Sequence, residues 1–307
     1  MATPRSQLVD PEVPLHYHLI SRCVRRSYLC GRDARTGKDY NHRKQWLTQR
    51  MFKLARCFAV EIDGYAIMDN HFHLVVYYDP QACHHWSNEE VATRWIQAFP
   101  PRSSSSSPEE QTATATLHHD ALLQQPERLQ QYRRTLGSLS AFMKHLKQPI
   151  AWRANREDGC SGHFFEDRFY SGALLCEDSV LATMAYVDLN PFRAKIAASI
   201  EQCQDTSIAN RLQVAASDPK RLAQALAPLV SGLTDSDRVL PMSLSDYCEH
   251  LSSLIDYQPD DVPGRELTWF NRVASIRKRQ RAYGFEQAQK NWALRRGWRR
   301  SCPAMGS

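Results

Sequence analysis

The chain has 307 residues, of which 42% are hydrophobic and 23% charged, with a formal net charge of +6. This composition is typical of a soluble globular protein. No apolar run approaches the roughly 20 residues that span a bilayer, and the N-terminus lacks the apolar core of a secretory signal. We therefore expect a cytoplasmic protein without membrane segments.

The nine cysteines are odd in number and irregularly spaced, and none of them forms a CxxC pair. A zinc ribbon or a disulfide scaffold would need paired spacing. Reduced thiols are the simplest interpretation, as is usual in the cytosol.

The basic residues are concentrated at the two ends of the chain. Residues 1–60 carry 12 basic and 4 acidic side chains, and residues 271–300 carry 10 basic and 1 acidic, so the middle is acidic. Basic flanks favour a polyanionic partner, although a solvated charged face is the simpler alternative. Tyr283, Phe285, Trp292 and Trp298 lie among the C-terminal arginines. This mixture favours nucleic acid, because rings stack on bases while arginine neutralises phosphate.

In chain order, alternation of apolar residues predicts a strand over residues 14–22, and helical spacing predicts a helix over 41–58. Two further strands are predicted over 59–68 and 72–78, separated by hairpin spacing. The stretch that follows contains five consecutive serines and several prolines. We interpret about 80–127 as an insertion with a flexible centre.

Helical periodicity returns over residues 128–148, an extended segment is expected over 163–175, and a helix over 177–189 ends at an Asn-Pro pair. This order predicts an α+β fold, with an antiparallel sheet and helices packed on it. We place a domain boundary near residue 205. Residues 1–205 would form one domain that includes the insertion, and 206–307 a mostly helical, basic region that contacts nucleic acid.

His71 and His73 stand at alternate positions of a predicted strand, so their side chains share one face and could bind one divalent ion. Imidazole suits zinc, iron or manganese, but a third ligand is needed. A purely structural role is the common alternative for this pattern. His16 and His18 form a second such pair, which we interpret as structural or as support for metal ligands.

Tyr186 and Asn190 are four residues apart on a predicted helix and therefore share a face. The Asn190 side-chain oxygen could complete a metal site to which the phenol points. The ion would polarise a phosphate while the Tyr186 oxygen attacks phosphorus, and a phosphotyrosine bond would store the energy for rejoining. The alternative for a helical tyrosine is a packed core ring.

Together these segments resemble one family. IMDNHFHLVV resembles the HUH motif of the single-tyrosine transposases, and AYVDLNPFRAKIA resembles the tyrosine-helix motif of their REP-associated branch. GHFFEDRFYSGAL resembles the segment before that helix, and HYHLISRCVRRSYLCG the first strand. The resemblance covers about residues 14–80 and 128–200. HxH followed by YxxxNP in this order is more specific than either motif alone.

The resemblance implies a ferredoxin-like antiparallel sheet, dependence on Mg or Mn, and a 5′-phosphotyrosine intermediate with a free 3′-OH. The implied substrate is an imperfect hairpin of repetitive palindromic DNA, cleaved beside a short guide sequence. By position, His71 and His73 become metal ligands, Tyr186 the nucleophile and Asn190 the third ligand, where wider relatives use Gln. The insertion and the region after residue 205 have no counterpart in the smallest members.

Several basic residues near these motifs are candidate phosphate contacts, with surface solvation as the alternative. They are Arg22, Arg25, Arg26, Arg168, Arg193, Arg277, Lys278, Arg279 and Arg281. In the segment TSIANR, Ser207 could cap a helix and Arg211 could contact phosphate, and a simple cap is the favoured interpretation of the two.

Three functions remain open at this point. The first is a metal-dependent transposase-type enzyme that nicks and rejoins single-stranded or hairpin DNA. The second is a non-catalytic regulator that binds hairpin DNA or RNA, which would not need the full set of histidines, tyrosine and asparagine. The third is a hydrolase that uses water, which needs more acidic ligands than Asp69, whose predicted position is on a turn. The sequence does not tell whether Tyr186 acts in its own subunit, or whether the protein is a monomer or a homodimer.

Overall fold

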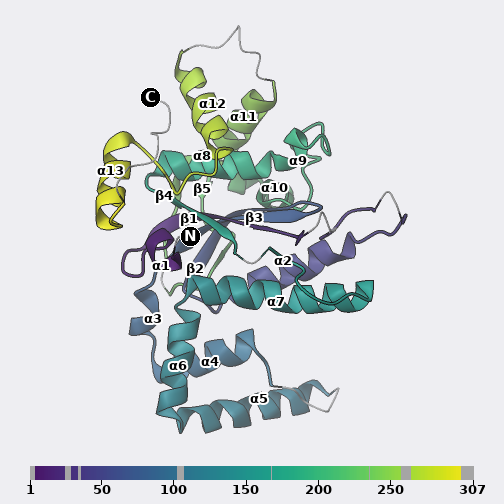
Figure 1. The fold of residues 1–307 in the computed structure, drawn as a ribbon, viewed down its shortest axis with the longest axis vertical. Helices are drawn as coiled ribbons and strands as arrows, with labels where there is room; N and C mark the ends of the chain where they lie inside the picture. Colours follow the sequence, from purple (N-terminus) through teal and green to yellow (C-terminus); the bar gives the residue numbers. More distant parts are fainter. Residues whose placement is uncertain are drawn as a thin grey trace.

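The computed structural model describes residues 4–24, 29–33, 36–101, 107–166, 168–234, 236–256 and 264–298. At its centre is a six-stranded sheet with the strand order β6-β2-β3-β1-β4-β8. Figure 1 shows α2 (His42–Ala55) and α7 (Leu139–Asp158) on one face of the sheet and α8 (Glu177–Asp188) on the other. The predicted α+β class is therefore confirmed. The strands, preceded by α1 (Arg5–Leu8), are β1 (Leu15–Arg22), β2 (Val60–Ile67), β3 (His71–Tyr78), β4 (Tyr170–Leu174), β6 (Val230–Ser231) and β8 (Ala282–Tyr283).

The strands β2 and β3 form the predicted hairpin, closed by a hydrogen bond of 2.8 Å from the Met68 amide to the His71 carbonyl. On its other side, β3 pairs antiparallel with β1, so that Arg22 lies opposite His71. Among the described strands of this sheet, β8 differs, because it runs parallel to β4. The prediction of an antiparallel sheet is wrong at this edge, since a two-residue strand is too short to show alternation. The ferredoxin-like arrangement stays a prediction.

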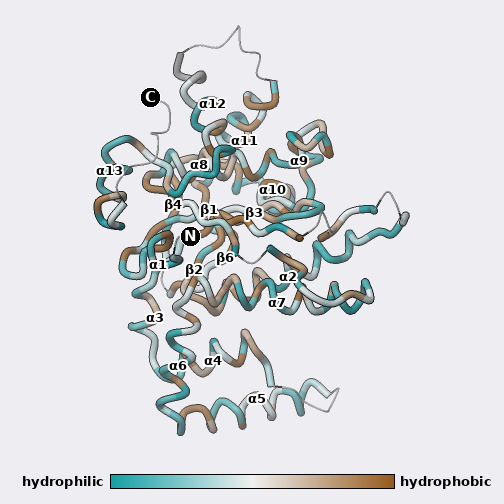
Figure 2. Tube along the Cα trace, in the orientation of Figure 1, coloured by the Kyte–Doolittle hydropathy of each residue, from teal (hydrophilic) through white to brown (hydrophobic). Residues whose placement is uncertain are grey.

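Alternation along β3 divides its side chains between two apolar cores. Phe72 and Val76 belong to the core that α2 and α7 cover, whereas Val75 belongs to the core that α8 covers. His71 and His73 alternate in phase with Val75 and therefore face α8. Figure 2 shows that hydrophobic residues follow the central strands. Within the part of the chain that the structure describes, none of the helices is long and apolar enough to cross a bilayer.

The insertion expected at about 80–127 is largely helical where it is described. Figure 1 shows these helices as an arm that projects away from the sheet. Ser87 caps one of them, because its hydroxyl accepts from the Glu90 amide while the Glu90 carboxylate accepts from the Ser87 amide. Pro108 suits the first turn of the next helix. Residues 102–106, in the serine run, lie outside the described residues. The elements are α3 (Ala82–His85), α4 (Asn88–Ala98) and α5 (Pro108–Leu123).

The single helix predicted over 128–148 is in fact two helices, α6 (Pro126–Leu136) and α7. The chain turns at Gly137, where a Cβ atom would lie only 2.3 Å from the Cys83 sulfur. Ser138 then starts α7, because its hydroxyl accepts a hydrogen bond from the Ala141 amide. Periodicity alone does not reveal this break, since apolar residues continue across it.

The region after residue 205 is mainly helical where it is described, and it also supplies both edge strands of the sheet, β6 and β8. Arg238 connects this region to β2, the strand next to the edge strand β6, because its guanidinium pairs with the fully buried Glu61 and Asp63. Residues on both sides of the predicted boundary thus build one sheet. The further elements are α10 (Ser207–Ser217), the 3₁₀ helix η2 (Pro219–Ala223), β5 (Ala225–Leu226), β7 (Leu240–Ser243), α11 (Leu244–Ile255), α12 (Gly264–Ile276) and α13 (Glu286–Arg295).

Candidate active site

The four residues predicted to form the site lie together between β3 and α8. The ring centroids of His71 and His73 are 4.9 Å apart, and the Tyr186 ring lies 5.9 Å from that of His73. The Asn190 side-chain nitrogen is 3.2 Å from the Nε2 atom of His73. His73 is buried, whereas His71, Tyr186 and Asn190 are half-buried and can be reached from solvent. The predicted convergence is present, while the chemical roles of these residues stay predictions.

The end of α8 differs slightly from the prediction. The helix stops at Asp188, and Asn190 begins a separate turn, α9 (Asn190–Arg193). Pro191 is accommodated at the start of this turn, because the first residues of a helix need no internal N–H bond. Asn190 therefore lies beside His73, although it does not share one continuous helix with Tyr186.

Hydrogen bonds select the proton position on both histidines. The Nδ1 atom of His71 lies 2.6 Å from the Oδ1 atom of Asn70, which can only accept, so Nδ1 of His71 carries the proton. The Nδ1 atom of His73 lies 2.9 Å from Nε2 of His18, while Asn190 donates to Nε2 of His73. Both histidines consequently keep the Nε2 lone pair that a metal ion requires.

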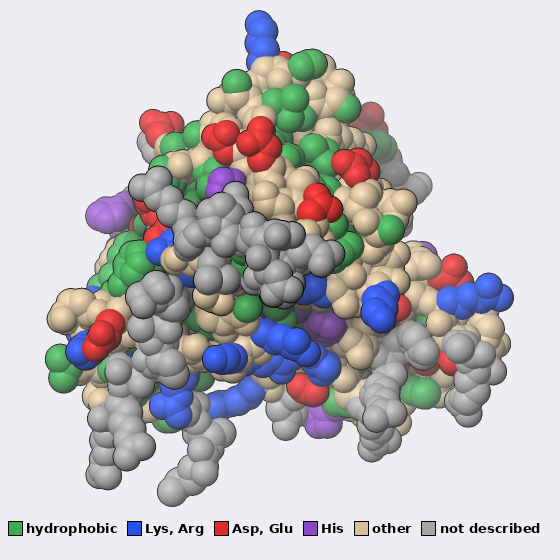
Figure 3. Space-filling view, turned by 90° about the horizontal axis from the view of Figure 1, so that it is seen from above, with side chains coloured by type: hydrophobic (Ala, Val, Ile, Leu, Met, Phe, Trp, Pro, Cys, Tyr) green, Lys and Arg blue, Asp and Glu red, His purple; other side chains and the backbone are tan. Residues whose placement is uncertain are grey.

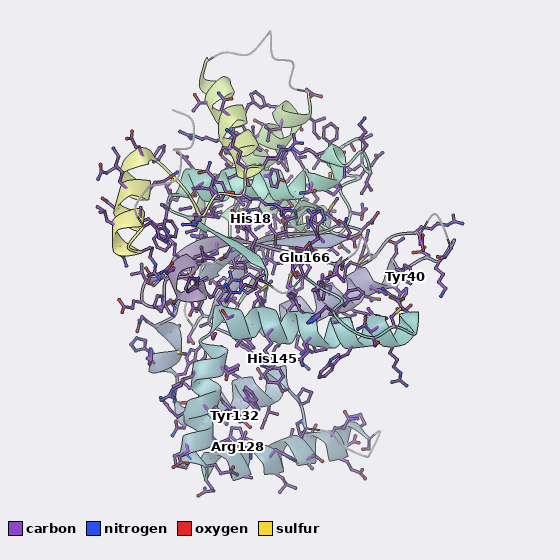
Figure 4. The ribbon with its side chains drawn as sticks, in the orientation of Figure 1. His18, Tyr40, Arg128, Tyr132, His145 and Glu166 are labelled. Carbon is purple, nitrogen blue, oxygen red and sulfur yellow. The ribbon has the colours of Figure 1, made fainter. Side chains whose placement is uncertain are left out.

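The second histidine pair divides between two surroundings. His18 stacks on His73 with a centroid distance of 5.1 Å, and Figure 4 labels it in the region between the sheet and α8. His16 instead contacts Asp63 and Arg238 at the far end of β1. Our interpretation of this pair as structural or supporting fits both positions.

Burial keeps the imidazoles neutral. Burial, together with the charges of Arg22 and Arg279, lowers the pKa of His71 to about 4. Burial lowers the pKa of His18 to about 3 and that of His73 well below its usual range. Neutral imidazole is the form that binds metals.

The donor atoms of this site decide whether it fits a divalent ion. Among the described residues, no group of three or more His, Cys, Asp or Glu is arranged to hold a metal. The available donors are instead the two Nε2 lone pairs and, after rotation of its amide, the Asn190 oxygen. This neutral set fits one ion with open positions for phosphate oxygens, and its nitrogen donors suit Mn better than Mg.

Basic side chains surround this group. Arg22 lies opposite His71 in the sheet, and the Arg193 guanidinium carbon lies 4.7 Å from the Tyr186 ring centroid. Arg279 lies close enough to lower the pKa values of both site histidines. Its neighbours Arg277, Lys278 and Arg281 are also exposed, in the segment between α12 and β8. We refer to residues 277–281 as the basic loop. Figure 3 shows Lys and Arg side chains gathered beside a histidine on the upper face of the molecule.

The remaining predicted phosphate contacts are placed differently. Arg168 is exposed and lies near Arg5, whose pKa is lowered mainly by burial and in addition by the charge of Arg168. Arg25 and Arg26 lie outside the described residues. Arg211, the possible phosphate contact, donates its guanidinium to the backbone carbonyls of Asp63 and Ala227. The cap expected at Ser207 is formed by Thr206 instead, whose hydroxyl accepts from the Ala209 amide.

Tyr170, which the sequence did not single out, and Tyr283 attach the basic loop to the sheet. Tyr283 and Trp292 were expected to stack on bases, and this expectation is wrong for both, because their rings are buried in the protein. The Tyr170 and Tyr283 hydroxyls lie 2.8 Å apart, and Tyr170 donates to the Gln280 carbonyl while the Gln280 amide donates to Tyr283. Gly172 leaves room for this contact, since a Cβ atom there would lie 2.9 Å from the Gln280 oxygen. Tyr170 and Gly172 belong to GHFFEDRFYSGAL, so the motif was visible but its partner in the distant loop was not.

No protein-family model matches this chain, and no curated protein matches it. A solved structure of a REP-associated tyrosine transposase bound to a REP hairpin resembles it with a TM-score of 0.36 and 10% sequence identity. The similarity covers 79% of this chain and 99% of the other. A TM-score this low does not establish a common fold, so the chemistry of this chain has to be inferred from its own residues.

Proposed function

We propose that this protein is a transposase-type enzyme that nicks and rejoins single-stranded or hairpin DNA through a covalent bond between Tyr186 and a 5′ phosphate. One observation carries the proposal. Residues 117 positions apart in the sequence, His73 and Asn190, meet beside the Tyr186 ring, and each has the donor atoms that the chemistry needs. Hairpins of repetitive palindromic DNA are the proposed substrate, in line with the resemblance of the two motifs.

The reaction would begin when the phenol of Tyr186 loses its proton and its oxygen attacks phosphorus. The bond from phosphorus to the 3′ oxygen breaks, and that oxygen takes up a proton and leaves as a 3′-OH. The guanidinium of Arg193 would stabilise negative charge on the attacking oxygen. An Mg or Mn ion held by His71, His73 and Asn190 would polarise the phosphate. Attack by a 3′-OH on the phosphotyrosine reverses these steps and rejoins the strand without ATP.

The basic loop would bind the DNA backbone. We expect Arg279→Gln to weaken hairpin binding and to reduce the slope of log Kd against log salt by about 1, because one phosphate contact is lost. Arg221→Gln removes an equal charge from an exposed ion pair with Asp218 and should change neither quantity. Fluorescence anisotropy over a range of salt concentrations measures both. If Arg279→Gln and Arg221→Gln gave the same slope of log Kd against log salt, the basic loop would not be part of the DNA interface.

A non-catalytic regulator that binds hairpin DNA or RNA is the second candidate. One observation supports it: no group of three or more His, Cys, Asp or Glu lies together among the described residues, and hard ions such as Mg bind carboxylates in preference to neutral ligands. The water-using hydrolase gains no support, because the Asp69 carboxylate lies against Gly31. The transposase-type enzyme and the regulator would both use the basic loop to bind DNA, and they differ in whether the protein forms a covalent bond with the DNA.

The deciding experiment incubates wild-type protein with labelled hairpin oligonucleotides from the DNA that flanks the gene. We expect a protein–DNA adduct that survives denaturing electrophoresis when Mn is present and disappears when EDTA is added. If the protein binds the hairpin in a salt-sensitive way but forms no adduct in either Mg or Mn, it is a regulator and the proposal of a transposase-type enzyme is wrong.

A further inference from the structure

Asp188 is a fully buried carboxylate in the last turn of α8, two residues from Tyr186 and two from Asn190. It accepts three hydrogen bonds. The Ser207 hydroxyl at 2.5 Å and the Ile208 amide at 2.8 Å donate to its Oδ1 atom, and the Tyr247 hydroxyl at 2.7 Å donates to Oδ2. Three donors on a buried carboxylate offset much of the cost of burying its charge.

These donors connect the tyrosine helix to the sheet and to α11. Ser207 begins α10 and also accepts a hydrogen bond of 3.1 Å from the Tyr65 amide on β2. The residue after Tyr65, Ala66, pairs directly with His73 in the neighbouring strand. A short series of hydrogen-bonded residues therefore connects β3, which carries His73, through β2 and Ser207 to Asp188. Tyr247 of α11 is also fully buried, and its hydroxyl donates to the other carboxylate oxygen of Asp188.

The rest of α8 packs mainly through apolar side chains such as Val180, Met184 and Val187. Apolar contacts are not directional, so a helix held by them alone can shift along or turn upon the sheet. A carboxylate that fits three fixed donors accepts only one position.

We infer that Asp188 is a positioning residue, which together with Ser207 and Tyr247 sets the distance of the Tyr186 phenol from the histidines. The inference rests on the proposed function of Tyr186. It also gives the region after residue 205 a role, because α10 and α11 supply all three donors.

The test uses the full chain with 3-fluorotyrosine at position 186 and records its ¹⁹F NMR signal without metal or DNA. The signal reports the position of the phenol relative to the neighbouring rings of His73 and His18. We expect Tyr247→Phe to move the signal or split it, and Asp188→Ala to do so more strongly. Asp188→Asn should leave it close to wild type, because the amide oxygen still accepts from Ser207 and Ile208 while the amide nitrogen donates to Tyr247.

Tyr78→Phe is the matched control, since it also removes one hydroxyl from a buried tyrosine, whose partner is the Gly137 carbonyl near the arm. It should lower the melting temperature as Tyr247→Phe does and leave the Tyr186 signal unchanged. An unchanged signal in folded Tyr247→Phe, or an equal change in Tyr78→Phe, overturns the inference. If Asp188→Ala does not fold, Tyr247→Phe alone decides.

Adduct formation adds a kinetic readout. We expect Tyr247→Phe to slow the adduct-forming step at saturating DNA by roughly 10- to 100-fold, the effect of a small misplacement of a reacting group, with hairpin affinity unchanged. A loss of affinity with an unchanged rate would contradict positioning. If wild type forms no adduct, the proposed function fails, and the ¹⁹F measurement still decides whether Asp188 positions Tyr186.

Discussion

We expect the Tyr186→Phe protein to form covalent adduct at least roughly 1,000-fold more slowly than wild type, because the substitution removes the atom that would bond to phosphorus. The ring itself remains, and with it the packing against His73 and the contact with Arg193. Folding and hairpin affinity should therefore be close to those of wild type. Denaturing electrophoresis measures the adduct, and anisotropy measures the affinity.

Tyr170 provides the control for this prediction. Its ring lies 5.8 Å from that of His18, so it is a second tyrosine close to the site, but its hydroxyl is engaged by Gln280 and Tyr283. We expect Tyr170→Phe to keep the adduct, and mass spectrometry of the wild-type adduct to place the nucleotide on Tyr186. If the Tyr186→Phe protein still cleaved the DNA strand, the nucleophile would be water, and the protein would be a hydrolase.

The elements that carry the site could be predicted from the sequence because each has a strong local signal. The strands predicted over 14–22, 59–68 and 72–78 and the helix over 177–189 agree with β1, β2, β3 and α8 to within one or two residues. Alternation, a hairpin turn and an Asn-Pro stop identify them. That α8 lies across β3, and so brings Tyr186 to His73, was implied by the family resemblance and not by spacing.

The parts that could not be predicted depend on contacts between distant segments. The two-residue strands β6 and β8 exist only because they pair with the sheet edges. The break at Gly137 depends on the approach of Cys83, and the anchor at Asp188 on residues from α10 and α11. Composition did not reveal the helices that flank the serine run of the insertion, because capping residues allow helices in a stretch rich in Ser, Thr and Gln.

His73→Ala should abolish detectable Mn binding and reduce adduct formation to the level seen in EDTA. The substitution removes one of two imidazole ligands from a site that has no carboxylate to compensate, among the residues that the structure describes. Electron paramagnetic resonance titration measures free Mn directly and does not depend on catalysis. Stabilisation by Mn, read as a rise in melting temperature, should disappear in parallel.

The two other histidines of the sheet give this prediction a graded control. His18→Leu removes the partner of the His73 Nδ1 atom and should weaken Mn binding by roughly 10- to 100-fold, as loss of a residue that orients a ligand does. His16→Leu lies on the same strand but contacts Asp63 and Arg238, so it should lower stability and leave Mn affinity unchanged. Equal effects of the two substitutions, or Mn binding that persists in His73→Ala, would mean that the ion lies elsewhere.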